Sequence, residues 1–296
     1  MIAAMVIKME DINNSDMPVQ FIGQRSRLSS CSSVKFVDKE RLVACNLAGQ
    51  RMYLIRYDLE SGHHEIEHCI PTQFGGKDVR TDLLDSDNKG RFATSNCEHG
   101  SISIYRLNGE RLNFEKNLPI LEKNPGFCHG VKFVPPKGDI ICATTLKNNP
   151  SVYFLRVGSG KVIFKLREDG WRPKDVCFLD SSRMVVIYSY ATPSYIEAAP
   201  YDSKVSLIAL DLRAKRHKVI SEFMISGHVD CCRHLGERVY ITNGSRDCVM
   251  IFRLEGGTLT LDGELPGYYF PHGIDLMPGL LAVTNYGSNT IVLTRI

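Results

Sequence analysis

The feature that most constrains this chain is an internal repeat. Six segments share one layout and open near residues 32, 80, 129, 174, 227 and 272, which is an interval of about 45 residues. Each opening, such as HGVKFV from His129, is followed by a short run rich in β-branched residues and then by an alternating run. Units of this kind cannot bury their apolar faces alone, so each must pack against its neighbours.

The runs within each unit have the character of β-strands. They have strand length rather than helix length, and the third run of each unit alternates apolar and polar residues, as in SISIYRL from Ser101. Turn signals such as Asn108-Gly109 separate the third run from a fourth in most units. Four antiparallel strands at this period predict an all-β, six-bladed β-propeller, formed by residues 1–296 as a single domain.

The sixth unit raises the question of how the ring closes. Its third strand ends at Ile296, and no fourth run follows. An unpaired strand edge must be covered, so an N-terminal strand is expected to complete the last blade. We expect residues 17–27, which include MPVQFIG, to supply this strand, and residues 1–16 to form a flexible N-terminus.

The last two units resemble known propeller repeats. VYITNGSRDCVMIFRL from Val239 and LAVTNYGSNTIVLTRI from Leu281 are similar to the YVTN-type repeat. PHGIDL from Pro271 resembles the strand openings of NHL-type and lactonase-like propellers. The first four units match only in layout. The resemblance therefore implies the fold and leaves the chemistry to the site residues.

Composition narrows the classes of function. The chain has 36 Lys+Arg against 33 Asp+Glu, and these residues are scattered, so neither nucleic acid nor a membrane is an expected partner. Phosphate-loop and dinucleotide motifs are absent from the sequence, which argues against a nucleotide cofactor. The ten cysteines are predicted to be reduced, and the N-terminus lacks a signal-peptide pattern. We therefore expect a cytoplasmic protein that acts on a small molecule, with a protein partner as the alternative.

A ligand site is expected at the upper mouth of the central channel, where the first strand of each blade begins. Three of the openings carry His129, His228 and His272. Imidazoles that converge from separate strands suit zinc or another transition metal. The spacing from His228 to its following apolar residue differs by one, however, so strand alternation predicts that its ring faces the other way unless one extra loop residue restores it.

Two other metal sites are consistent with the residues near the mouth. One combines thiols and imidazoles from neighbouring blades, namely Cys97, His99, Cys128 and His129. The other is a calcium site of the kind found in gluconolactonase-like propellers, with oxygen ligands from Asn46, Asn96, Asn243, Asn285 and Asp175. Ser32-Ser33 stands where that family would place an acidic ligand, and Asn in these loops also suits tight turns.

A metal-free site is a further possibility. Lys174, Arg80 and Arg172 could hold an anionic substrate while a histidine or Asp175 moves a proton. These charges could equally form structural ion pairs with one another, as expected for Lys35 and Lys132 with Asp230 and Asp275. The predicted catalytic residues are His129, His228, His272, Lys174 and Asp175.

Aromatic residues and a long loop complete the predicted mouth. The segment from Tyr188 to Ser203 is a long insertion in the fourth unit, and we expect it to cover the site. The predicted substrate-binding residues are Arg80, Asn96, Phe127, Trp171, Arg172, Tyr190, Tyr195, Asn243, Tyr269 and Asn285. Together these features favour a hydrolase or a lyase or cyclase acting on a small molecule. The alternative is a non-catalytic scaffold that binds a peptide or protein on the same face.

Overall fold

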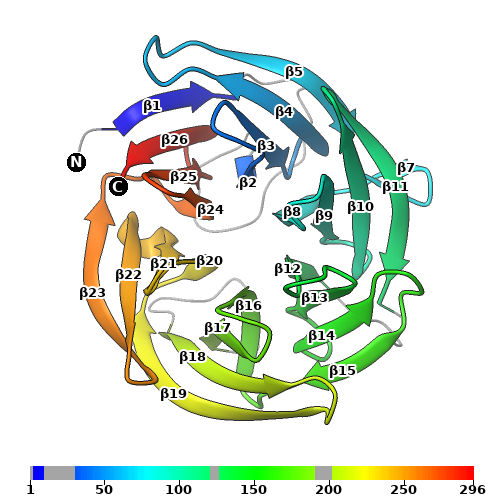
Figure 1. The fold of residues 1–296 in the computed structure, drawn as a ribbon, viewed down its shortest axis with the longest axis vertical. Helices are drawn as coiled ribbons and strands as arrows, with labels where there is room; N and C mark the ends of the chain where they lie inside the picture. Colours follow the sequence, from blue (N-terminus) through cyan, green and yellow to red (C-terminus); the bar gives the residue numbers. More distant parts are fainter. Residues whose placement is uncertain (1–2, 10–30, 121–126, 191–201) are drawn as a thin grey trace.

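Six four-stranded antiparallel sheets surround a central channel, which confirms the predicted six-bladed propeller (Figure 1). The structure is a computed structural model that describes residues 3–9, 31–120, 127–190 and 202–296. Apart from one short 3₁₀ helix, η1 (Gly244–Arg246), the regular secondary structure of the described residues consists of β-strands. A search of the same residues finds no helix with the length and apolar character needed to cross a bilayer.

Each blade runs from an inner strand at the channel to an outer strand at the rim. The first two blades consist of β2 (Cys31–Phe36), β3 (Arg41–Asn46), β4 (Arg51–Tyr57) and β5 (His64–Pro71), and of β8 (Thr81–Ser86), β9 (Arg91–Asn96), β10 (Ser101–Asn108) and β11 (Arg111–Pro119). The small hairpin between them is β6 (Gln73–Phe74) and β7 (Lys77–Asp78). The third blade consists of β12 (Cys128–Phe133), β13 (Ile140–Thr145), β14 (Ser151–Arg156) and β15 (Val162–Leu166).

The remaining blades continue the same order around the ring. The fourth consists of β16 (Trp171–Phe178), β17 (Arg183–Tyr190), β18 (Asp202–Asp211) and β19 (Arg216–Ser226). The fifth consists of β20 (Val229–Leu235), β21 (Arg238–Asn243), β22 (Cys248–Glu255) and β23 (Thr258–Pro266). The sixth contains β24 (Pro271–Met277), β25 (Leu280–Asn285) and β26 (Thr290–Arg295), with β1 (Ala3–Lys8) as its outer strand.

An N-terminal strand closes the last blade, but it is not the one predicted. β1 pairs antiparallel with β26, and the two lie side by side in Figure 1. The expectation of a flexible segment over residues 1–16 is therefore wrong for residues 3–8, while the predicted closing strand at 17–27 lies outside the described residues. Met5 and Ile7 are buried and Val6 is 48% exposed, which is the alternation of a half-buried strand. This short strand covers the edge of β26.

Apolar side chains fill the spaces between neighbouring blades. One buried cluster joins Leu280 and Leu293 of the sixth blade to Val34 and Leu42 of the first. Equivalent clusters lie between other adjacent blades, so no blade buries its faces alone. The ring must therefore be complete before any single blade is stable.

Hydroxyl groups tie each inner strand to the blade before it. Thr144 Oγ1 donates to the carbonyl oxygen of Lys174 at 2.8 Å, and Thr242 Oγ1 donates to that of His272 at 2.7 Å. Ser95 Oγ makes the same bond to the carbonyl oxygen of His129. These bonds fix the backbone at the strand openings, which is where the predicted site residues lie.

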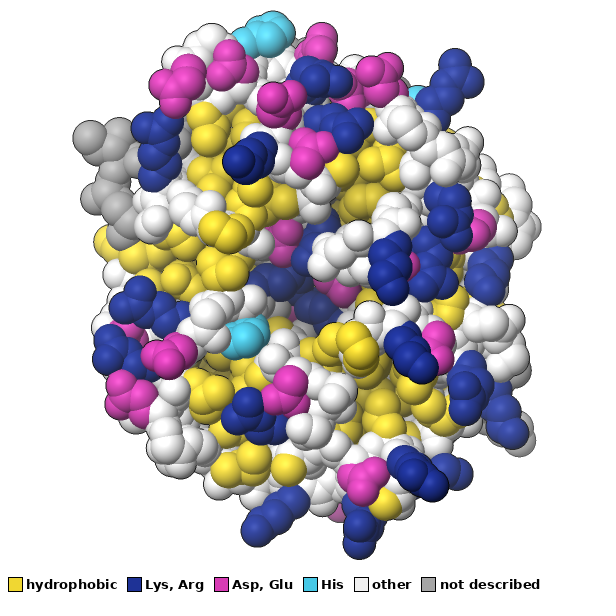
Figure 2. Space-filling model, viewed as in Figure 1, with side chains coloured by type: hydrophobic (Ala, Val, Ile, Leu, Met, Phe, Trp, Pro, Cys, Tyr) yellow, Lys and Arg dark blue, Asp and Glu magenta, His cyan; other side chains and the backbone are white. Residues whose placement is uncertain are grey.

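A ring of paired charges fills the lower part of the channel. We call Asp85, Asp175 and Asp275 the channel aspartates; each accepts a backbone N–H from another blade, at 2.8 to 3.1 Å. Lys132 Nζ lies 2.7 Å from Asp175 Oδ1, and Lys35 Nζ lies 3.0 Å from Asp275 Oδ1. Figure 2 shows basic and acidic side chains together inside the central hollow.

The predicted pairing of these charges is correct for Lys35 with Asp275, whereas Lys132 pairs with Asp175. Arg233 adds a third cation, with contacts of 3.4 Å to Asp175 and 3.3 Å to Asp275. Burial alone would raise the pKa of Asp85, but Lys35, Arg233 and Lys132 outweigh it and lower that pKa. Three cations therefore balance three carboxylates.

Candidate functional site

Side chains from five blades meet at the upper mouth of the channel. We call Asp82, His129, Lys174, His228, Asp230 and His272 the mouth cluster; all six are buried. Each inner strand carries a register shift at its opening, for example between Cys128 and Val131 in β12 and between Val229 and Cys232 in β20. Such bulges re-aim side chains, and here they turn consecutive positions of the opening toward the channel.

The expectation that the His228 ring faces away from the channel is wrong. Cys232 pairs with Ile241 as Val131 pairs with Ala143, so Asp230 occupies the position of His129, and His228, two residues earlier, faces the same cluster. The Nε2 atom of His228 lies 2.9 Å from Oδ1 of Asp230 and 3.3 Å from Nζ of Lys174. The His228 ring therefore joins the mouth cluster. It does so as a partner of Asp230 rather than as the third member of a histidine triad.

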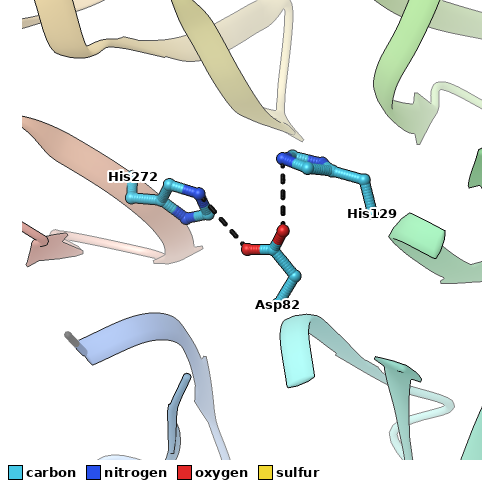
Figure 3. A group of neighbouring side chains, drawn as sticks. All are labelled: Asp82, His129 and His272. Atoms are coloured by element: carbon cyan, nitrogen blue, oxygen red, sulfur yellow. Dashed lines mark ion pairs between the residues drawn. The ribbon is translucent and has the colours of Figure 1, made fainter. Parts of the chain in front are cut away.

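His129 and His272 are held in the same way on different blades. Nδ1 of His129 lies 2.8 Å from the carbonyl oxygen of Lys174, and Nδ1 of His272 lies 2.8 Å from that of Ser32. Their Nε2 atoms lie 3.5 and 3.3 Å from the two carboxylate oxygens of Asp82. Figure 3 shows the three side chains directed toward one another from separate strands.

Lys174 and Asp230 form a buried ion pair beside these histidines. Nζ of Lys174 lies 3.0 Å from Oδ1 of Asp230, which is also 3.4 Å from Nε2 of His129. Burial disfavours the ionised form of Asp230, but His228, Lys174 and His272 hold the pKa of this carboxyl well below its usual value. Burial, together with the Lys174 ammonium, lowers the pKa of His228. The cluster thus places an ionised carboxylate against a lysine and a neutral imidazole.

Among the described residues, Asp82, His129 and His272 form the group whose ligand atoms could surround a metal ion, all lying within 4.8 Å of one another. The predicted triad of His129, His228 and His272 is therefore revised, with Asp82 in place of His228. A catalytic metal site commonly uses two imidazoles and one carboxylate with an open position.

The two other predicted metal sites do not form in the described part of the chain. Among the described residues, the ligand atoms of Cys97, His99, Cys128 and His129 do not come together as a group that could hold a metal ion. The ring of His99 stacks instead on Phe74, with centroids 5.0 Å apart. The calcium arrangement fails because Asp175 is engaged by Lys132 in the lower ring.

Asp175 is likewise placed away from the predicted catalytic group. Its carboxylate is taken up by Lys132, Arg233 and the backbone N–H of Cys232. The preceding residue, Lys174, contributes to the mouth cluster instead. The two neighbouring side chains lie on either side of the bulge between Pro173 and Asp175 in β16 and contact different groups. The structure assigns Asp175 to the architecture of the channel.

The predicted asparagines brace the loops that surround the mouth. Asn96 Nδ2 donates to the hydroxyls of Ser101 and Ser103, each at 2.9 Å. Asn243 Nδ2 donates to a backbone carbonyl oxygen, and Asn285 Oδ1 accepts the N–H of Tyr269. Asn46 Oδ1 accepts a turn N–H in the same manner. These amides hold turns, as the composition of the loops also suggested.

The predicted aromatic and basic residues divide between the mouth and the blades. Phe127 lies over His129 with ring centroids 6.4 Å apart. Trp171 packs edge-on against Tyr190 and beneath the Lys204 ammonium, so it belongs to the packing of the fourth blade. The Tyr269 ring packs against Gly287, and Nε of Arg80 lies 3.4 Å from Oε1 of Glu98. Arg172 lies in β16. Tyr195 lies outside the described residues.

Four residues of the mouth were not among the predicted catalytic or substrate-binding residues. Phe270 stacks on His228 with centroids 6.1 Å apart, and Tyr286 stacks on His272 with centroids 5.3 Å apart. The carboxylates of Asp82 and Asp230 complete the cluster. Both aspartates stand at strand openings within apolar runs, and a buried acid in such a run is the signal that could have identified them.

Comparisons with known proteins support the propeller fold but do not establish a function. No family model matches the chain, and no curated protein matches it. Virginiamycin B lyase from Staphylococcus aureus aligns at 13% identity and a TM-score of 0.59, over 90% of this chain and 95% of that one. A Bacteroides uniformis protein provisionally named a 6-phosphogluconolactonase aligns at 17% identity and a TM-score of 0.60, over 89% and 80%.

A non-enzymatic name also occurs among the similar structures. The C-terminal WD40 domain of Sif2 aligns at 12% identity and a TM-score of 0.54, over 90% of this chain and 96% of that one. The likeness shows the fold alone. It confirms the fold-level resemblance to lactonase-like propellers, and the chemistry must be argued from the mouth cluster.

Proposed function

We propose that this propeller is a small-molecule enzyme of the hydrolase or lyase class, with the mouth cluster as its active site. The observation that carries the proposal is the convergence of two anchored histidines on one buried carboxylate. Nε2 of His129 and Nε2 of His272 both face Asp82, while their Nδ1 atoms are held by backbone carbonyls. The lyase and the provisional lactonase among the structural neighbours are named as enzymes, which is in keeping with this proposal.

The geometry supports proton transfer next to a stabilised negative charge. A histidine of the cluster would take a proton from a water molecule or from a substrate carbon, as general bases do. The Lys174 ammonium, paired with Asp230 at 3.0 Å, would stabilise the oxyanion that develops on the substrate. Both effects are strengthened because the groups are buried, where water screens charges poorly.

The proposal is tested with two substrate panels. Lactones and aryl esters report hydrolysis through proton release, and uronate-containing substrates report β-elimination through the ultraviolet absorbance of the new double bond. His272→Gln and Lys174→Met are expected to lower kcat/KM by about 10²–10⁴-fold, because the first removes one of the imidazoles that converge on Asp82 and the second removes the ammonium that would stabilise the oxyanion. His99→Gln is the matched control, because that ring stacks on Phe74 away from the cluster. Turnover that survives both mouth substitutions would contradict the proposal.

A scaffold that binds a protein on the same face is the second candidate. Tyr190 is 51% exposed and Tyr269 is 38% exposed, and exposed aromatic residues are common anchors of protein interfaces. This candidate predicts no turnover on either panel. It also predicts that Tyr190→Ala and Tyr269→Ala weaken capture of a partner while His272→Gln does not.

A further inference from the structure

We propose that Asp82, His129 and His272 bind one divalent transition-metal ion, with zinc as the best fit. The proposal deepens the proposed function and rests on it in one respect, namely that the ion would serve the same substrate. The binding itself follows from the contacts of the three side chains. It differs from the three-histidine site expected from the sequence because a carboxylate replaces His228.

The hydrogen-bond partners of His129 and His272 show which ring nitrogens carry protons. A backbone carbonyl oxygen can only accept a hydrogen bond, so Nδ1 of His129 and Nδ1 of His272 must both carry hydrogen. In a neutral ring Nε2 is then a lone-pair acceptor. Both Nε2 atoms nevertheless face carboxylate oxygens of Asp82, which are also acceptors. Acceptors that face one another in a buried site need a cation between them, which is either a proton on the ring or a metal ion. Metal binding by the chain distinguishes the two.

The distances between the imidazole nitrogens and the Asp82 oxygens can be compared with those around a zinc ion. Zinc binds imidazole nitrogen and carboxylate oxygen at about 2.0–2.2 Å in tetrahedral geometry, which places neighbouring ligand atoms about 3.3–3.5 Å apart. The observed separations between Nε2 and the Asp82 oxygens are 3.5 and 3.3 Å. One of these distances runs to each oxygen of Asp82, and the ligand atoms of all three residues lie within 4.8 Å of one another. The three side chains are therefore close enough to bind one ion.

The hydrogen bonds around Asp82, His129 and His272 are those expected around metal ligands. Metal-binding histidines almost always donate their other ring N–H to a carbonyl or a carboxylate, and both histidines do so here. Oδ1 of Asp82 is buried and accepts no hydrogen bond from any described residue. An unsatisfied buried carboxylate oxygen directed at two imidazoles is an independent sign that a ligand is held between them.

The donor atoms of the three side chains indicate which kind of metal ion would bind. Two imidazole nitrogens argue against calcium and magnesium, which prefer oxygen ligands. One carboxylate with two imidazoles leaves coordination positions open, as in catalytic zinc sites. Asp230 Oδ1, at 3.4 Å from Nε2 of His129, lies beside these positions. An ion there would polarise a substrate oxygen next to the Lys174–Asp230 pair.

The test is cobalt binding to the full chain after removal of metals with a chelator. We expect one equivalent of Co²⁺ to give a visible absorption spectrum of low coordination number, which one equivalent of Zn²⁺ abolishes. Asp82→Asn and His272→Gln should weaken Co²⁺ binding by more than the roughly 10–100-fold that changes around a ligand cause. His228→Gln should retain the spectrum and the stoichiometry, and His99→Gln is the control for unrelated histidines.

Two results would overturn the metal site. One is a folded, metal-free wild-type chain that binds neither Co²⁺ nor Zn²⁺, a measurement that depends on no variant. The other is binding that persists in both Asp82→Asn and His272→Gln, with the fold verified by circular dichroism. The proposed function fails separately: stoichiometric metal without turnover supports the site and refutes the enzyme, whereas turnover by a chain that binds no metal refutes the site alone.

Discussion

The clearest quantitative prediction concerns Asp175, which the structure assigns to the architecture of the channel. Its carboxylate is fully buried, receives Lys132 Nζ at 2.7 and 2.8 Å, and accepts the N–H of Cys232 at 3.1 Å. Asp175→Asn retains the size and one acceptor but removes the charge. Lys132 is then left buried without its closest partner, while Arg233 keeps its contact with Asp275. Breaking a buried pair in this way costs about 3–5 kcal/mol.

Thermal and urea unfolding, followed by far-ultraviolet circular dichroism and by the fluorescence of Trp171, would measure this cost. A loss of about 3–5 kcal/mol corresponds to a Tm lower by roughly 6–20 °C at 2–4 °C per kcal/mol. Lys132→Met in the Asp175→Asn background should restore at least about 1 kcal/mol, because it removes the unpaired ammonium.

Glu115→Gln is the matched control for Asp175→Asn. It breaks an exposed pair with Arg106 and should cost about 1 kcal/mol or less. The reasoning is refuted if Asp175→Asn is as stable as wild type within about 1 kcal/mol, or if the double variant is less stable than the single one.

Three further predictions concern the ring. The pKa of Asp85 is lower in the folded chain than its value of about 3.9 in the unfolded chain, so its stabilisation is present above about pH 4 and is lost as the pH falls through the folded pKa. Urea unfolding between about pH 3 and pH 6 should therefore show a steeper loss for wild type than for Asp85→Asn, and equal slopes would contradict this. Gly130→Ala places a Cβ 2.8 Å from Asp175 Oδ1 and from two other atoms, so we expect a loss of about 1–3 kcal/mol in thermal melts rather than an unchanged Tm. Ile7→Ala in β1 should cost about 2–5 kcal/mol while the exposed Val6→Ala stays within about 0.5 kcal/mol, and similar costs for both would show that β1 does not close the ring.

The fold could be predicted from the sequence because its signals are local and repeated six times. Strand length, alternation and turns such as Asn108-Gly109 recur in each unit, so one ambiguous unit is corrected by the others. The closing strand occurs only once and lacks that support. Its pattern in residues 3–8 is short, and the apolar residues of 17–23 compete with it on equal terms.

The candidate site was predicted only in part, because its geometry depends on bulges and on contacts between distant blades. His129, His272 and Lys174 could be found from their place at the strand openings. The pairing of Asp82 with His272 joins residues 190 positions apart, and only closure of the ring brings them together. In β20 it is Cys232 rather than Val229 that occupies the position of Val131, and the sequence alone does not distinguish these two apolar residues.

The two levels of the channel differ in a way that separates stability from binding. In the lower ring each channel aspartate accepts a backbone N–H and faces a lysine or an arginine, so its charge is satisfied within the protein. In the mouth cluster Asp82 Oδ1 and Asp230 Oδ2 are buried without a hydrogen bond from the described residues. Folding alone gives no reason to keep unsatisfied carboxylate oxygens buried, since each costs stability. A ligand that satisfies these oxygens supplies the reason, and the lower ring provides the rigid frame that can tolerate the cost.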